Sequence, residues 1–212
     1  APIETSKRNR QGTRAEQAAR GEIPFTFADD RLRPDSRKTR RLPSASLPEK
    51  KTESGKPMQI GITRVLQPPL SLSGDSFRYE VSGGHVFLMS VSSKGAKAVR
   101  VRFSEMNLPE GSRIFIFPLG KDEFYGPFHN SPLPDKTLWT PPVSGEVIVI
   151  EFFLPNGQLE KTDDYFQVLE IAHNFSGVGE FLLGPPEQPC HNDVGAEYAS
   201  MASAVGYLEF VN

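Results

Sequence analysis

Residues 97–105 read KAVRVRFSE, and this stretch decides the fold class. Val99, Val101 and Phe103 alternate strictly with the charged side chains of Arg100 and Arg102. Successive side chains of a β-strand point to opposite faces of its sheet. The pattern therefore predicts a half-buried antiparallel strand, with the three apolar side chains inward and the two arginines outward.

Further short runs rich in Val, Ile, Phe and Tyr occur on both sides of this stretch, and Gly, Pro, Asn, Asp or Ser bound each of them. These bounding residues are turn formers, so the runs read as strands separated by turns. GEVIVIEFFLP (145–155) is nearly continuously apolar, which is typical of a central strand. We predict an all-β fold for residues 57–186, an antiparallel β-sandwich of jelly-roll type. The other runs are FRYEV (77–81), HVFLMSVSS (85–93), SRIFIFPLG (112–120), EFYGPF (123–128) and DYFQVLEIAHNF (164–175).

Residues 1–56 differ in composition from the remainder of the chain. They hold 14 Lys/Arg against 8 Asp/Glu, whereas residues 57–212 hold 10 against 18. Prolines, clustered charges and few aliphatic residues leave too little apolar surface to offset the entropy of ordering. We predict a flexible basic leader with one short helix over residues 13–20. The leader could dock on an acidic body, nucleic acid or a membrane surface, but a solvated leader is the favoured interpretation.

Two partner classes are not expected. Nucleic-acid-binding tails interleave aromatic with basic residues, and the leader carries only Phe25 and Phe27. No apolar run approaches the roughly 18 residues of a membrane-spanning helix. We therefore expect neither nucleic-acid binding nor membrane insertion. The basic run RKTRR instead marks Arg37, Lys38, Arg40 and Arg41 as candidates for cleavage by a processing protease.

A search for catalytic or metal-binding residues finds no constellation. The sequence has no G-x-S-x-G, P-loop or G-x-G-x-x-G motif. The four histidines are His85, His129, His173 and His191, and apart from the adjacent Cys190–His191 pair none has metal-ligand spacing. His173 lies in a predicted strand, where a packed histidine is the favoured interpretation. We predict no catalytic residue, cofactor or metal.

Three further features stay open. Cys190 is the single cysteine, and it is a small buried residue, a reactive thiol or half of a disulfide with a partner outside the sequence. Trp139 and Tyr125 could contact a sugar or peptide, although a lone tryptophan beside prolines more often fills the end of a sandwich core. The acidic pairs 122–123 and 163–164 could bind Ca²⁺, but solvated turns are favoured.

Several segments in order resemble the N-terminal pro-domain of secreted bacterial trypsin-like serine proteases of the lysyl-endopeptidase type. They are KPMQIGITRVL (56–66), SSKGAKAVRVRFSEMNLPEGSRIFIFPL (92–119), YGPFHN (125–130), LWTPPVSGEVIVIEFFLP (138–155) and FQVLEIAHNFSGVG (166–179). The residues that match the family pattern are Ser93, Gly95, Ala96, Arg100, Phe103, Leu108, Pro109, Gly111, Gly126, Pro127, Trp139, Pro141, Val143, Gly145 and Glu151.

The resemblance extends to the end of the chain. PCHNDV (189–194) is similar to the first residues of the mature protease, and SAVGYLEFVN (203–212) resembles the first strand of its chymotrypsin-like double barrel. The resemblance thus implies that residues 187–212 start a truncated protease domain, and that the chain as given lacks the catalytic triad. Cys190 would pair with a cysteine beyond Asn212. The family's next cysteine falls on Ala196, and His191 replaces its asparagine, so the usual disulfide pattern is altered.

The function that the resemblance implies is that of a secreted pro-domain, extracellular or periplasmic. It would assist the folding of the protease domain that follows in the chain and inhibit it. The expected partners are that domain and a processing protease. The alternative is an independent sandwich that binds carbohydrate or Ca²⁺.

Overall fold

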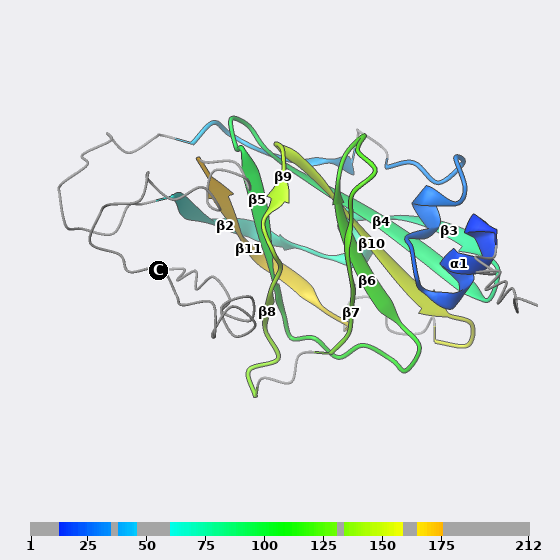
Figure 1. Ribbon diagram of the computed structural model, residues 1–212. Coiled ribbons are helices and arrows are strands. Elements are labelled where there is room, and N and C mark those ends of the chain that lie inside the picture. The colour runs from blue at the N-terminus through cyan, green and yellow to red at the C-terminus, as the bar shows by residue number, and fades with distance from the viewer. Residues whose placement is uncertain (1–12, 35–37, 46–59, 131–133, 159–164, 176–212) are drawn as a thin grey trace, which may run out of the picture.

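The structure is a computed structural model that describes residues 13–34, 38–45, 60–130, 134–158 and 165–175. Two β-sheets pack face to face, and a short helical segment lies against the outside of one of them (Figure 1). Sheet A has six strands and sheet B has five. The prediction of an all-β sandwich is confirmed.

Sheet A contains the predicted central strand. Its order is β1-β4-β10-β6-β7, and β3 also pairs with β4. All pairs are antiparallel except β1 with β4, which is parallel. The nearly continuous apolar run forms β10, which lies between β4 and β6 as expected for a strand buried on both faces. The strands are β1 (Arg40–Leu42), β3 (Phe77–Val81), β4 (Gly84–Ser93), β6 (Arg113–Pro118), β7 (Tyr125–Phe128) and β10 (Val147–Pro155).

Sheet B is entirely antiparallel. Its order is β2-β11-β5-β8, and β9 also pairs with β5. The four-residue helix α2 (Leu72–Asp75) connects β2 to β3 and so joins the two sheets. The strands are β2 (Gly61–Leu70), β5 (Ala98–Ser104), β8 (Leu138–Trp139), β9 (Val143–Ser144) and β11 (Gln167–Asn174).

The main apolar core fills the space between the sheets. It takes Val99, Val101 and Phe103 from β5, each 0% exposed, while Arg100 and Arg102 lie half-buried on the opposite face. The alternation predicted for this strand is therefore confirmed. Aromatic rings tie the sheets together, because the ring of Phe166, next to β11 of sheet B, meets Phe152 of β10 in sheet A edge-on at 5.3 Å between centroids. Such pairs contribute roughly 0.5–1.5 kcal/mol beyond the area they bury.

The prediction of a flexible leader over residues 1–56 is wrong for its described parts. Residues 13–34 form α1 (Arg14–Arg20) and η1 (Phe25–Phe27), and residues 40–42 form β1. The short helix predicted over residues 13–20 is α1. Its Thr13 side chain accepts a hydrogen bond from Glu16 N, and the Glu16 carboxylate accepts one from Thr13 N. This capping box gives the first turn a local reason to form.

A second apolar cluster explains why this N-terminal segment (residues 13–34) is ordered. It lies on the face of sheet A that points away from sheet B, called here the outer face of sheet A. Ala18, Phe25 and Leu32 are each less than 10% exposed and pack against strand residues of that face. The Phe25 ring stacks on Phe153 at 5.3 Å. The average composition of the leader concealed these few well-placed apolar residues.

The remaining boundaries stay predictions. The described sandwich strands span residues 61–174 with β1 added at 40–42, and the bounds 57–186 stay a prediction. The start of the protease domain predicted over residues 187–212 lies outside the described residues, as does its predicted strand over 203–211.

We predict that Gly84→Ala strongly destabilises the sandwich. Gly84 pairs with Pro155 at the start of β4, and an added Cβ would lie 2.2 Å from the carbonyl oxygen of Leu154. Backbone strands would have to separate, so the free energy of unfolding should fall by about 2 kcal/mol or more. Urea denaturation followed by Trp139 fluorescence measures the change.

Gly74→Ala is the matched control, because the nearest atom to its added Cβ, Ser71 Oγ, is 3.1 Å away and belongs to a side chain. It should change stability by less than about 1 kcal/mol. Equal urea midpoints for the two variants would contradict the prediction.

Candidate functional surfaces

The histidines do not converge on a common site. His85 is buried on β4, His129 is exposed after β7, and His173 is buried on β11. Among the described residues, no group of three or more His, Cys, Asp or Glu side chains could hold a metal ion. Cys190 and His191 lie outside the described part of the chain.

His173 joins the two sheets through a buried polar contact. Its Nδ1 lies 2.8 Å from Ser93 Oγ on β4, and Arg64 on β2 donates a hydrogen bond to the same oxygen at 3.1 Å. Ser93 is 0% exposed and His173 is 1% exposed, so no substrate can reach this serine–histidine pair. The packed-histidine interpretation is confirmed. Burial lowers the pKa of His173, and the charge of Arg64 lowers it further.

The outer face of sheet A has a carboxylate at its centre. Glu151 on β10 is 1% exposed and accepts hydrogen bonds from Phe25 N at 2.6 Å and from Thr26 N at 2.9 Å. The Thr26 hydroxyl also hydrogen-bonds to it. The first N–H groups of a helical turn lack hydrogen-bond acceptors within the turn. The Glu151 carboxylate is the acceptor for these N–H groups of η1. Glu151 therefore fixes the N-terminal segment in place.

Arg113 on β6 holds the other end of the same segment. Its guanidinium donates to Ala18 O at 2.7 Å and Ala19 O at 3.3 Å, which are carbonyls of the last turn of α1. The guanidinium lies 4.2 Å from the ring centre of Phe153. Gly21 is the C-cap of helix α1 and has a φ of +78°. A Cβ added at Gly21 would lie only 2.9 Å from the Arg113 side chain, so the absence of a side chain leaves room for Arg113. Only glycine meets both requirements without strain.

The two buried charges affect one another. Burial raises the pKa of Glu151, while the hydrogen bonds from Thr26 and Phe25 and the charge of Arg113 act in the opposite direction. Burial likewise lowers the pKa of Arg113, and the charge of Glu151 offsets part of that effect. Each charged group thus depends on polar groups of the N-terminal segment, since an uncompensated buried charge is costly.

The processing candidates lie in or beside paired backbone. Arg37 lies outside the described residues. Arg40 and Arg41 belong to β1 and pair with β4, and Arg40 also forms an ion pair with Asp75 at 2.7 Å. Proteases cut most readily in exposed loops, where the backbone is free of such pairing. Cleavage after Arg40 or Arg41 thus requires β1 to leave sheet A, and processing there stays a prediction.

Lys38 is also engaged by the sandwich. Its Nζ donates to Ser76 O at 2.7 Å and lies 4.7 Å from the centre of the Phe77 ring. A lysine bound in this way is not presented to a protease until these contacts break.

Trp139 and Tyr125 do not form one platform. Trp139 on β8 is half-buried on the face of sheet B that points away from sheet A, with the Arg100 guanidinium 5.5 Å from its ring. The expectation that it fills the sandwich core is wrong, because its neighbour Leu138 faces the core instead. Tyr125 lies on β7 of sheet A and packs against the core, where burial raises the pKa of its hydroxyl.

The acidic pair at 122–123 is part of a local surface network. Glu123 accepts a hydrogen bond from the Ser144 hydroxyl and lies 3.9 Å from Lys121 Nζ. Asp122 is exposed beside it. This arrangement supports the favoured interpretation of a solvated turn. The pair at 163–164 lies outside the described residues.

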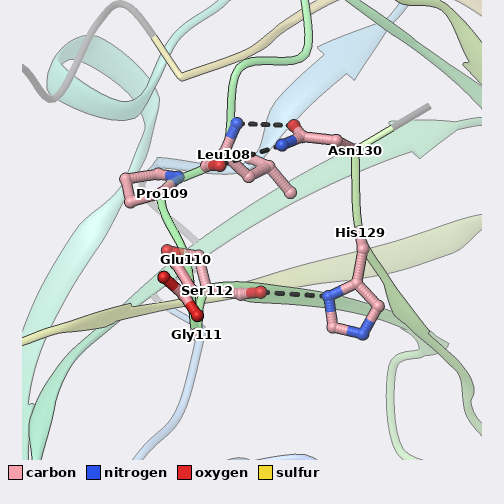
Figure 2. Close-up of a pocket in the computed structure, with 7 residues that line it drawn as sticks. All are labelled: Leu108, Pro109, Glu110, Gly111, Ser112, His129 and Asn130. Carbon is pink, nitrogen blue, oxygen red and sulfur yellow. Dashed lines mark hydrogen bonds between the residues drawn. The ribbon is translucent and has the colours of Figure 1, made fainter. Parts of the chain in front are cut away.

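A shallow pocket of about 400 Å³ collects several residues of the family pattern (Figure 2). It lies between the loop of residues 108–112 and residues 129–130. The Asn130 side chain accepts from Leu108 N at 2.6 Å and donates to Leu108 O at 2.9 Å, and His129 Nδ1 lies 3.2 Å from Ser112 O (Figure 2). These hydrogen bonds tie the two loops together, and the pattern residue Leu108 takes part through its backbone, which is a structural role.

The fold and its surfaces define an antiparallel sandwich domain that carries a docked N-terminal segment. Residues 32–175 match the family described as the lysyl endopeptidase N-terminal domain. The match covers more than half of the chain, and the chain belongs to this family. No curated protein matches the sequence. Among the described residues, no helix is long and apolar enough to cross a membrane.

Sequence reasoning missed Arg113 and the partners of Glu151. Signals for both were present in the chain. Thr13 and Glu16 have capping-box spacing, Gly21 follows the helical stretch, and the only two aromatic residues of the leader are in η1. Together they indicate a helical segment whose apolar face packs against another part of the protein.

We predict that Glu151→Ala detaches the N-terminal segment and destabilises the domain. The substitution leaves the N–H groups of Phe25 and Thr26 buried without an acceptor, which should cost about 3 kcal/mol. Glu151→Gln keeps one acceptor oxygen and should cost less. Urea denaturation gives the stability, and amide hydrogen exchange of residues 13–34 reports detachment.

Glu80→Gln, an exposed position on β3, serves as the control for loss of a carboxylate. If Glu151→Ala were as stable as Glu80→Gln, the carboxylate would not be what holds the segment.

We also predict that stability falls as the pH drops below about 6.5, the ordinary pKa of histidine. Because the folded pKa of His173 is lowered, the unfolded chain takes up a proton in this range that the folded chain does not, and protons then favour unfolding. In His173→Gln the difference in melting temperature between pH 7 and pH 5 should shrink.

Glu151 changes the stability with pH in the opposite direction, because the pKa of its carboxyl is raised in the folded state. That contribution is present in both proteins and cancels when the variant is compared with the unaltered chain at each pH. Ser93→Ala keeps the buried imidazole and should retain the pH dependence while lowering stability. A pH dependence that is unchanged in His173→Gln would disprove the assignment.

Proposed function

We propose that this chain is the pro-domain of a secreted trypsin-like serine endopeptidase, and that it assists the folding of the protease domain following it and inhibits that domain until cleavage. The observation that carries the proposal is the family match over residues 32–175. The family is described as the N-terminal domain of lysyl endopeptidase, which supports a role for this domain toward the polypeptide that follows it.

The physical argument for folding assistance concerns topology. A chymotrypsin-like double barrel is built from strand pairs that are distant in sequence, and such folds form slowly. A sandwich that is already folded beside the nascent barrel offers fixed surfaces on which those pairs can form. Inhibition needs the same contact to persist over the active-site cleft until proteolysis removes it.

The alternative of an independent carbohydrate-binding or Ca²⁺-binding module gains no support from the described residues. Sugar-binding platforms place aromatic rings side by side, whereas Trp139 and Tyr125 lie on different sheets and Tyr125 packs against the core. Of the described acidic pair at 122–123, Glu123 accepts a hydrogen bond from Ser144 and lies 3.9 Å from Lys121 Nζ. We therefore do not adopt this alternative.

The test begins with the reading frame downstream of Asn212 in the source DNA. The protease domain, taken from residue 187 to the end of that frame, is produced alone, unfolded in denaturant and diluted with or without this chain added in trans. We expect the chain to raise the recovered peptidase activity, and to lower the activity of native protease in a saturable titration.

The Gly84→Ala variant, whose sandwich should be disrupted, is the matched control and should do neither. The proposal fails if the frame encodes no protease, or if the intact chain neither improves refolding nor inhibits.

A further inference from the structure

The outer face of sheet B, the face that points away from sheet A, carries one row of side chains across four strands. Register places Val65 of β2, Glu170 of β11, Arg102 of β5 and Trp139 of β8 side by side. Arg100, two residues from Arg102 on the same face, covers the Trp139 ring and donates to Thr140 O at 2.8 Å. Tryptophan and arginine are the residue types most enriched where proteins bind one another tightly.

The helical elements packed outside the sandwich lie elsewhere. In the part of the chain that the structure describes, α1 and η1 cover sheet A, at the end of the molecule where β3 ends and β4 begins (Figure 1). Val65 is 59% exposed, and it is one of two large hydrophobic residues described as exposed. Val65 thus adds an exposed apolar side chain to the row that holds Trp139 and Arg102.

This face also contains buried polar atoms. Asn174 pairs with Ala98 on the outer side of sheet B and is 1% exposed, yet its Nδ2 has no hydrogen-bond partner among the described residues. Arg102 Nε is also buried and without such a partner. Buried donors in folded proteins almost always have acceptors. The acceptors for these two groups are therefore bound water or groups outside the described residues.

Charge indicates which segment would cover this face. Among the described residues, Arg100 and Arg102 lie on this face beside Glu170, which is 3.2 Å from Arg102, and Asp135 lies close enough to Arg102 for their charges to interact. Residues 176–212 contain five Asp/Glu and no Lys/Arg, and they include the apolar run FLL at 181–183. They follow directly from β11, an interior strand of sheet B.

We propose that the outer face of sheet B binds residues 176–212 of the same chain. Acidic side chains of that segment meet Arg100 and Arg102, and its apolar side chains cover Val65 and Trp139. The contact is an interaction within this chain, so it goes beyond the proposed function and stands even where that function fails.

The experiment uses the full 212-residue chain and two readouts. Hydrogen exchange followed by mass spectrometry measures amide protection in residues 176–212. Trp139 is the only tryptophan, so its emission maximum and its quenching by acrylamide report directly on coverage of the face. We expect measurable protection of the segment, and loss of that protection with a red shift and stronger quenching in Arg100→Glu/Arg102→Glu.

A second variant keeps the sandwich untouched and neutralises the segment instead. It should reproduce both changes, and raised salt should produce them partially, since exposed charge pairs are screened. Arg78→Glu on β3 of sheet A is the matched control and should leave both readouts as they are. The neutralised variant carries Glu180→Gln, Glu187→Gln, Asp193→Asn, Glu197→Gln and Glu209→Gln.

Three results would overturn the inference. One is a segment that exchanges without protection in the unaltered chain. Another is protection that neither variant reduces. The last is protection that appears only at high protein concentration, which would make a second copy the occupant. Because neither readout involves a protease, failure here is distinguishable from failure in the refolding and inhibition assays.

Discussion

The buried carboxylate of Glu151 is the constraint on which the outer half of this domain depends. Its neighbours across the strands, Leu88 and Phe115, are apolar and offer no hydrogen to an acceptor. A carboxylate in such surroundings is tolerated only when donors reach it. The two backbone N–H groups and the hydroxyl of η1 are those donors. The sandwich therefore requires residues 13–34 for its polar groups as well as for its apolar surface.

Arg113 makes this dependence mutual. Helix α1 is only seven residues long, and a helix of that length is unstable alone in water. It persists because its last carbonyls meet a buried guanidinium and because Ala18 is packed beneath it. The sheet needs the segment to compensate its charges, and the segment needs the sheet to exist as a helix. One outer face of the sandwich, that of sheet A, is thereby occupied by the N-terminal segment.

How much the sequence predicts depends on how local each signal is. The alternation in β5 and the apolar run of β10 are properties of adjacent residues, and both strands were predicted correctly. Trp139 was misplaced because β8 has two residues, too few for an alternation to show which face each occupies. The leader was misjudged because composition averages over 56 residues, whereas its docking depends on Phe25, Ala18 and a carboxylate more than 120 residues away.

The same long-range contact bears on where the domain begins. The family match starts at residue 32, so Ala18, Phe25 and Thr26 lie before it, whereas Arg113 and Glu151 lie within it. The matched range thus contains two buried charges whose partners it leaves out. Sequence similarity identifies the residues that recur among relatives, and burial identifies the residues that this fold cannot lack. By the second criterion the physical domain includes the segment that starts with the capping residue Thr13, because Glu151 and Arg113 are compensated only when that segment is in place.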